Sequence, residues 1–212
     1  MSQDESPFGA MQGVLPVKQA RSRKSRESFM EAGRRLAEQH NWEELTVSRL
    51  AEEAGCSVGA FYQRFENKDA FLLALVHDMI AEVRAGLHSL YGGTSAGHLP
   101  DALVAQSIAN FRRRSGLIRA AVRRGLEEAI YWDPVRAYGR EAAEAFLAWM
   151  RTSEGGLSTA RERQIRFAYQ MLLATLVNSL MNRPGPITLE SEAFVEELTQ
   201  AFKALTERPR SL

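Results

Sequence analysis

The 212-residue sequence contains a single cysteine, and this scarcity excludes two kinds of structure at once. One thiol forms no intramolecular disulfide and supplies no cysteine-built metal site. Such a composition is typical of a reducing compartment, so we expect a cytoplasmic protein. No apolar run reaches the roughly 18 residues that suggest a membrane span, and the first residues lack the basic start of a secretory signal. We therefore expect no membrane partner.

An excess of charge of either sign is also missing. The formal net charge is +1, from 27 basic and 26 acidic residues. This balance neither requires nor excludes a nucleic-acid partner, because the position of positive charge matters more than its sum. Hydrophobic residues make up 45% of the chain, which is enough to bury the core of one or two domains.

Convincing strand patterns and internal repeats are missing as well, and apolar residues recur at helical spacing along most of the chain. Helices are expected over 22–40, 47–54, 58–65, 68–90, 101–114, 117–130, 135–151, 159–181 and 189–206. Trp42 and Leu45 are expected to reach the core from the connection after the first of these helices. The pattern predicts an all-α fold of about nine helices.

Residues 46–72 read TVSRLAEEAGCSVGAFYQRFENKDAFL and contain two short helical patterns separated by a tight turn. Thr46 is expected to cap the first helix, Gly55 to end it in the left-handed conformation, and Ser57 to cap the second. This arrangement is typical of a helix-turn-helix, whose second helix enters the major groove of DNA. Small residues after Ser57 would let that helix approach the duplex closely.

The same segment resembles the tetracycline-repressor (TetR) family of transcriptional regulators. The resemblance covers about the first third of the chain and rests on Thr46, Leu50, Ala51, Ala54, Gly55, Ser57, Gly59, Phe61, Tyr62, Phe65, Lys68 and Leu72. It implies that Thr46, Tyr62 and Lys68 contact DNA phosphates. It also implies a base-reading surface made of Ser57, Val58, Gly59, Ala60 and Gln63. Arg64 departs from the family's common tyrosine or histidine, and either a phosphate or a guanine edge would suit it.

Each of these residues also has an explanation that needs no DNA. Thr46, Ser57 and Asn67 are explained as helix caps, and Lys68 as a solvated charge in a first helical turn. The full ordered set has no such explanation, because helix stability does not ask for Tyr62 and Lys68 together after a Gly-x-Ser turn. We predict a sequence-specific DNA-binding transcriptional regulator that is not an enzyme. The alternative is an all-helical enzyme or a protein-interaction module without DNA binding.

The resemblance divides the chain into three segments. Residues 1–17 are small and polar and are expected to be a disordered extension. Residues 18–73 are expected to be the helix-turn-helix DNA-binding domain, and 74–212 a helical effector-binding and dimerisation domain. The basic run from Lys18 to Arg26 is either a solvated surface or an arm along the duplex. Cys56 is either a small buried hydrophobe or a redox sensor.

The family also implies a homodimer that leaves a palindromic operator, a double-stranded DNA site, when a small organic effector binds. Aromatic side chains at helical spacing serve equally as core or as pocket wall. The effector candidates are Phe111, Trp132, Phe146 and Met150. The last two helices either close the monomer's core or pair with their copies in a second subunit. The dimer candidates are Ile165, Tyr169, Leu172, Leu173, Leu176, Val177, Leu180, Phe194, Leu198 and Phe202.

Two further patterns fail on inspection. Gly93 to Gly97 matches the G-x-S-x-G of a hydrolase nucleophile elbow, but that elbow needs a preceding strand, and here a long helical pattern comes first. The four histidines show no metal-binding spacing. We therefore predict no catalytic residues, no metal and no cofactor.

Overall fold

The computed structural model describes the backbone of residues 20–207 and the side chains of 23–95 and 97–207. The described part of the chain contains nine α-helices and three short 3₁₀ helices. They are α1 (Ala20–Gln39), η1 (Trp42–Glu44), α2 (Val47–Glu53), α3 (Val58–Tyr62), α4 (Lys68–Gly93), η2 (Ala96–His98), α5 (Leu99–Arg113), α6 (Ser115–Glu127), η3 (Ala129–Tyr131), α7 (Asp133–Glu154), α8 (Thr159–Asn182) and α9 (Glu192–Thr206). The predicted all-α class is confirmed. The predicted extension at 1–17 lies outside the described residues.

The predicted helix caps are present around the turn. The side-chain oxygens of Thr46 and Ser57 each accept a hydrogen bond from the amide three residues further on, both at 3.1 Å. Asn67 caps α4 in the same way at 2.8 Å. Gly55 has a φ of 61°, the left-handed conformation that lets α2 stop abruptly. These local contacts fix where α2, α3 and α4 begin.

The α3 helix is shorter than the sequence predicts. The expectation was a helix through Phe65, but α3 ends at Tyr62 and a turn follows. Arg64 Nη1 donates to the carbonyl oxygen of Ala60 at 2.8 Å, which holds this turn against the end of the helix. Phe65 still reaches the core, with its ring centroid 4.6 Å from that of Phe71. The apolar spacing predicted correctly that Phe65 is buried. It predicted wrongly that Phe65 is helical, because a side chain in a turn can also point into the core.

The chain divides into two compact units. The first contains residues up to Met79 together with Arg114–Pro134, and the second contains Ile80–Arg113 together with the residues from Val135 onward. The α4 helix therefore supplies residues to both units, and α6 packs against α1 in the first. The predicted boundary between the DNA-binding domain (18–73) and the effector-binding domain (74–212) was based on the helix-turn-helix motif, and it stays a prediction. The division by packing runs elsewhere, because contacts between distant segments place α6 in the first unit.

Phenylalanine rings form the centre of the first unit. Phe29, Phe61, Phe65 and Phe71 are fully buried. Phe61 lies edge-on to Phe29 at 5.4 Å between centroids and edge-on to Phe71 at the same distance. Such pairs contribute about 0.5–1.5 kcal/mol each beyond their buried area. Through Phe61, these contacts tie α3 to α1 and α4, while Val58 and Tyr62 of the same helix stay exposed.

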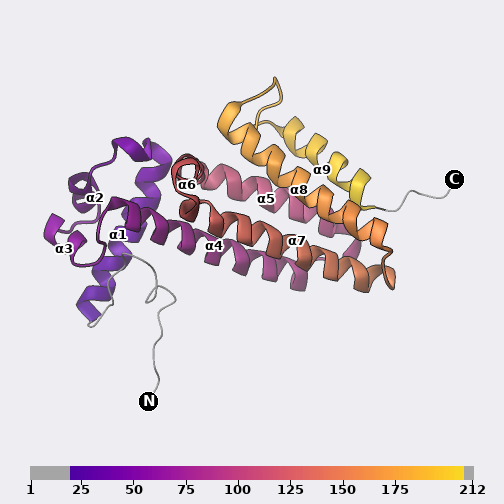
Figure 1. Ribbon diagram of the computed structural model, residues 1–212, viewed down its shortest axis with the longest axis horizontal. Coiled ribbons are helices and arrows are strands. Elements are labelled where there is room, and N and C mark those ends of the chain that lie inside the picture. The colour runs from indigo at the N-terminus through magenta and orange to yellow at the C-terminus, as the bar shows by residue number, and fades with distance from the viewer. Residues whose placement is uncertain (1–19, 208–212) are drawn as a thin grey trace, which may run out of the picture. The chain divides into compact units, whose positions relative to one another are not determined.

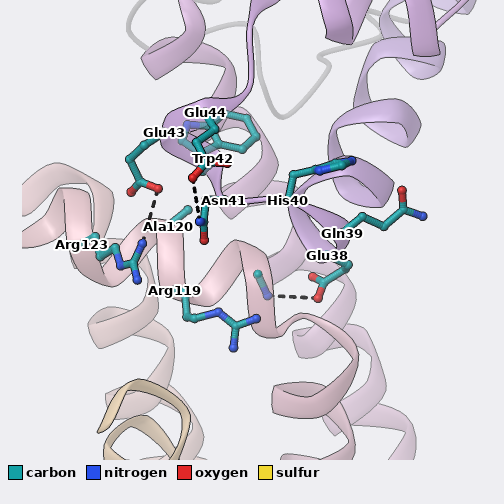
Figure 2. Close-up of a pocket in the computed structure, with 12 residues that line it drawn as sticks. Glu38, Gln39, His40, Asn41, Trp42, Glu43, Glu44, Arg119, Ala120 and Arg123 are labelled. Atoms are coloured by element: carbon teal, nitrogen blue, oxygen red, sulfur yellow. Dashed lines mark hydrogen bonds and ion pairs between the residues drawn. The ribbon is translucent and has the colours of Figure 1, made fainter.

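The connection between α1 and α2 is buried as the sequence predicts. Trp42 is 3% exposed and Leu45 is 5% exposed. The Trp42 ring packs on Phe71, with 6.0 Å between centroids. Close by, Glu38 Oε2 accepts a hydrogen bond from the Gly116 amide at 3.0 Å (Figure 2). The end of α1, η1 and the start of α6 thus form one packed corner of the first unit.

The second unit is a helical bundle in which α5, α8 and α9 pack side by side (Figure 1). Phe146 of α7 is fully buried, and three aromatic rings surround it. Its centroid lies 5.9 Å from that of Trp149, 6.4 Å from that of Tyr169 and 5.5 Å from that of Phe202. These contacts join α7, α8 and α9, so residues of the two C-terminal helices belong to the unit's own core.

Candidate nucleic-acid interface

The outward side of α3 carries the residues that the sequence predicts to read bases. Ser57 and Gly59 are exposed, and Val58 is 39% exposed although it is apolar. Gln63, at the end of the helix, is exposed, and Ala60 is half-buried. The small side chains leave room for base edges to approach this surface. The apolar group of Val58 and the amide of Gln63 can distinguish one base from another.

Gly59 has no internal reason to be glycine. A Cβ at this position would meet only the Ser57 hydroxyl oxygen, at 3.9 Å. Its φ is not among the positive values of the chain. Glycine within a helix costs about 1 kcal/mol relative to alanine. Since neither packing nor backbone conformation requires glycine here, the close approach of another molecule explains it best.

Two hydroxyl groups flank this surface. Tyr62 is 51% exposed, and its ring lies edge-on to the buried Phe61 at 5.5 Å between centroids. Thr46 is exposed, and its oxygen accepts the Arg49 amide, which leaves the hydroxyl hydrogen able to donate elsewhere. Both groups are exposed and have the chemistry of a phosphate contact. Their role on DNA stays a prediction.

Lys68 and Arg64 are placed differently from the other predicted contacts. Arg64 is 8% exposed, and its guanidinium donates to a backbone carbonyl of α3. The Lys68 ammonium donates to three backbone carbonyls between Trp42 and Leu45. Burial lowers the pKa of Lys68 from its ordinary value. The structure therefore engages both cations within the first unit rather than presenting them on the side of α3 that carries Val58.

Arg49 is an exposed cation beside Thr46 that the sequence reasoning missed. Its side chain is 52% exposed and forms an ion pair with Glu52 at 3.0 Å. Exposed pairs of this kind contribute about 0–1 kcal/mol, so a phosphate can replace the carboxylate. The sequence did carry a signal, because the dipole of α2 disfavours a cation in its first turn. A phosphate outside the helix would offset this unfavourable position more fully than the exposed Glu52 carboxylate does.

The basic run before α1 is only partly described. Lys24 is exposed, and Arg26 is half-buried, which lowers its pKa. The side chains of Lys18 and Arg21 lie outside the described residues. Cys56 is half-buried, with its sulfur 3.6 Å from the hydroxyl oxygen of Ser25. An arm on DNA formed by this run and a redox role of Cys56 stay predictions.

A polar hollow of about 280 Å³ lies between the end of α1, η1 and α6 (Figure 2). Both signs of charge line it. Arg123 Nη1 lies 3.5 Å from Glu43 Oε2, and Asn41 Nδ2 donates to Glu44 Oε1 at 3.0 Å. Because these groups satisfy one another, the hollow offers little attraction to an ionic ligand.

The effector candidates divide between the two units. Phe146 and Met150 of α7 are buried in the second unit, and Phe111 of α5 is 9% exposed there. Trp132 is half-buried and belongs to the first unit. The structure therefore brings Phe146 and Met150 onto one helix of the same unit and assigns Trp132 to the other unit. Their burial fits the core role that the sequence left open, and a pocket role stays a prediction.

Three tyrosines form a polar feature of the second unit that the sequence reasoning missed. Burial raises the pKa of Tyr138 to about 12 and raises the pKa values of Tyr91 and Tyr169 as well. The Tyr91 hydroxyl is buried and has no hydrogen-bond partner among the described residues. Buried hydroxyls normally have a partner, so this one marks a place where an acceptor is missing. Aromatic residues were read only as apolar surface, which hid this signal.

The dimer candidates are largely used inside the second unit. Buried there are Ile165, Tyr169, Leu172, Leu176, Leu180, Phe194 and Phe202, and half-buried are Leu173, Val177 and Leu198. On the other side of α8, Phe167 is 51% exposed and Met171 is 45% exposed. They lie one turn apart on one face. Apolar residues occur on both sides of α8, and helical period alone does not say which side turns inward.

Comparison with protein families identifies the first unit. Residues 29–75 match the sequence model described as bacterial regulatory proteins, tetR family. That span runs from α1 through the helix-turn-helix into α4. The chain belongs to the tetR family. It is therefore a DNA-binding transcriptional regulator of a family that is not enzymatic.

Solved structures share the fold of this tetR-family chain. A putative TetR-family regulator from Mesorhizobium loti is 17% identical, with a TM-score of 0.70 over 88% of this chain and 97% of that one. A regulator from Streptomyces coelicolor is 16% identical, with a TM-score of 0.67 over 90% and 80%. FadR from Bacillus subtilis, solved with stearoyl-CoA, is 15% identical, with a TM-score of 0.60 over 85% and 97%. Comparison with curated proteins gives no match.

Residues 20–207 lack two kinds of feature. No group of three histidine, cysteine, aspartate or glutamate side chains in this part is arranged to hold a metal ion. None of its helices combines the length and the apolar character that crossing a membrane requires.

Proposed function

We propose that this tetR-family regulator is a homodimeric repressor that a small organic effector releases from a palindromic operator. The observation that carries the proposal is the outward side of α3, where Gly59 has no internal reason to be glycine and Val58 is exposed. A five-residue helix reads few bases, so a second copy would supply the rest of the specificity. Helix-turn-helix dimers meet half-sites roughly 34–36 Å apart.

On DNA, α3 enters the major groove with Ser57, Val58, Gly59, Ala60 and Gln63 toward the base edges. The Gln63 amide can pair with an adenine, and Val58 can contact a thymine methyl group. Outside this surface, the Thr46 and Tyr62 hydroxyls and the Arg49 guanidinium meet phosphates and fix the orientation. Exposure of these groups supports the assignment.

The second subunit docks on the face of α8 that carries Phe167 and Met171. A phenylalanine 51% exposed beside a methionine 45% exposed is a pair that a partner would cover. Aromatic residues and methionine are enriched in protein interfaces. The buried residues of the same helices support this interface from beneath by holding α8 and α9 together.

The effector binds in the second unit, and Tyr91 donates a hydrogen bond to it. The buried, unpartnered Tyr91 hydroxyl supports a ligand that carries an acceptor and an apolar body. Bacillus subtilis FadR, which shares the fold, was solved with stearoyl-CoA, a ligand with a long acyl chain. If the effector weakens operator binding, linkage requires the operator to weaken effector binding by the same factor.

Selection of duplexes from a random pool by the full-length chain tests the reading role. We expect enrichment of a two-fold symmetric sequence, and Gln63→Ala should relax the preference at one position of each half-site. Gln39→Ala, an exposed glutamine of α1, is the matched control and should leave the selected sequence unchanged. A pool that shows no enriched sequence after repeated rounds would remove the basis of the proposal.

A further inference from the structure

Three backbone carbonyls surround the ammonium group of Lys68. Its Nζ donates to the carbonyl oxygens of Trp42 at 2.9 Å, Glu43 at 3.1 Å and Leu45 at 2.8 Å. A lysine ammonium has three N–H donors, so these acceptors use all of them. The same nitrogen lies 5.9 Å from the centre of the Trp42 ring, within the range of a cation–π contact.

The three carbonyls belong to η1 and to Leu45, the residue that follows it. Leu45 is the C-cap of η1, with an extended backbone at φ −69° and ψ 131°. The Trp42 carbonyl also accepts the Leu45 amide at 3.2 Å, which closes the 3₁₀ turn. Carbonyls at the end of a helical turn carry partial negative charge, which favours a cation beside them. Lys68 therefore closes the end of η1 from α4, a helix that starts more than twenty residues later in the chain.

Holding the Leu45 carbonyl also orients the next residue, Thr46. The described chain has no cis peptide bonds, and in a planar trans peptide the C=O and the following N–H point in opposite directions. With the Leu45 carbonyl turned toward Lys68, the peptide plane that leads into Thr46 is fixed. Thr46 then caps α2 and presents its hydroxyl on the exposed side.

We infer that Lys68 is a positioning residue for DNA binding: it fixes the connection before Thr46 and makes no phosphate contact of its own. The inference rests on the proposed DNA-binding surface of α2 and α3. The family resemblance implies the opposite role, a direct phosphate contact. For that role the ammonium would have to exchange one of three short bonds to carbonyls for a phosphate oxygen.

The surroundings of Lys68 agree with a half-buried structural cation. Burial lowers its pKa, while the nearby Asp69 and Glu43 carboxylates raise it and Arg124 lowers it. These two acidic groups favour the charged form of the half-buried ammonium. They would also repel a phosphate that approached the same nitrogen.

Hydrogen exchange on the DNA-free chain tests the positioning role without any operator. In Lys68→Met, amides of residues 42–49 should exchange faster by on the order of tenfold or more, because local opening of η1 becomes easier. Arg140→Met removes an exposed cation of the second unit and should leave these amides unchanged. Unchanged exchange over 42–49 in Lys68→Met would overturn the inference.

Binding to a selected duplex at several salt concentrations separates the two roles of Lys68. Lys68→Met should bind about tenfold more weakly, with the same salt slope as the control Arg140→Met. A slope smaller by about 0.9 would assign Lys68 to a phosphate and refute its positioning role. If no duplex binds even the unmodified chain, the proposed function fails, and the exchange experiment still decides whether Lys68 holds η1.

Lys68→Arg gives a second variant in case Lys68→Met does not fold. A guanidinium keeps the charge and suits a phosphate, but its planar fork does not match three carbonyls gathered around one nitrogen. We expect Lys68→Arg to bind about as weakly as Lys68→Met, at an unchanged salt slope. Wild-type affinity in Lys68→Arg would contradict the inference.

Discussion

Gly116 and Ala37 are in direct backbone contact: a Cβ built on Gly116 would lie 1.6 Å from the Ala37 carbonyl oxygen. Beside this contact, Glu38 accepts hydrogen bonds from the Ser115 hydroxyl at 3.1 Å and from the Gly116 amide at 3.0 Å. The start of α6 therefore rests on the last turn of α1 with no room for any side chain. This contact makes α6 part of the DNA-binding unit.

Gly116→Ala should destabilise the first unit by about 2–3 kcal/mol, since the backbone must shift to admit a methyl group. Gly92→Ala is the matched control, because a Cβ there meets nothing within 4 Å and its effect should stay within about 0.5 kcal/mol. Urea unfolding followed by tryptophan fluorescence measures both. Equal midpoints for the two variants would show that the α1–α6 contact is looser than described.

Gly59→Ala should separate stability from binding. The unfolding free energy should stay the same or rise by up to about 1 kcal/mol, because alanine favours helix and the site has room. Binding to a selected duplex should weaken by about 1–3 kcal/mol, because the methyl group takes space next to the base edges.

The control for Gly59→Ala is Gly55→Ala, which should lower the free energy of unfolding instead of leaving it unchanged or raising it. Gly55 has a φ of 61°, where alanine is strained by about 1–2 kcal/mol. Gel-shift titration together with thermal melting distinguishes the two glycines. If Gly59→Ala binds DNA as tightly as the unmodified chain, α3 does not approach the duplex through this residue.

His77 should make the stability of the first unit depend on pH. Burial lowers the pKa of this half-buried imidazole from its ordinary 6.5. A lowered folded pKa means that the unfolded chain binds the proton more tightly, so stability is complete above 6.5 and is lost as the pH falls. Between pH 7 and 5, His77→Gln should reduce the slope of the unfolding free energy against pH by no more than about 1.4 kcal/mol per pH unit. His88→Gln, at an exposed position, is the control in the same urea titrations.

Phe167→Glu should weaken self-association on the order of 30-fold or more, the effect of losing a central interface residue. The negative charge would be buried between the two copies without a partner. Ile187→Glu alters a residue that is 45% exposed in the same unit but outside α8, and it should leave association unchanged. Sedimentation velocity over a range of concentrations measures both. Association that survives Phe167→Glu would place the interface elsewhere.

Sequence reasoning succeeded wherever a local rule decided the outcome. Thr46, Ser57 and Asn67 cap the helices they precede, because a cap depends only on the next three residues. Gly55 ends α2 for an equally local reason. Trp42 and Leu45 are buried as predicted, since apolar side chains in a short connection have only the core to fill.

The failures concern contacts between residues distant in the sequence. Nothing near Lys68 indicates that its ammonium meets carbonyls 23 to 26 residues earlier. No local pattern indicated that Arg64 is buried against α3, and its role on DNA stays a prediction. The α8 helix has apolar residues on two sides, so the choice between Leu172 inside and Met171 outside depends on how the helix docks. Local patterns do not contain this information.

The Gly116–Ala37 contact has a consequence for engineering. The DNA-binding unit is assembled from two separate stretches of chain, residues up to Met79 and Arg114–Pro134. An excised fragment ending at Met79 would lack α6 and would uncover the apolar flank of α1. A chimaera that joins this DNA-binding unit to the sensor domain of another protein should therefore include α6 of the present chain. If α6 came from the other protein, any side chain at the position of Gly116 would collide with α1.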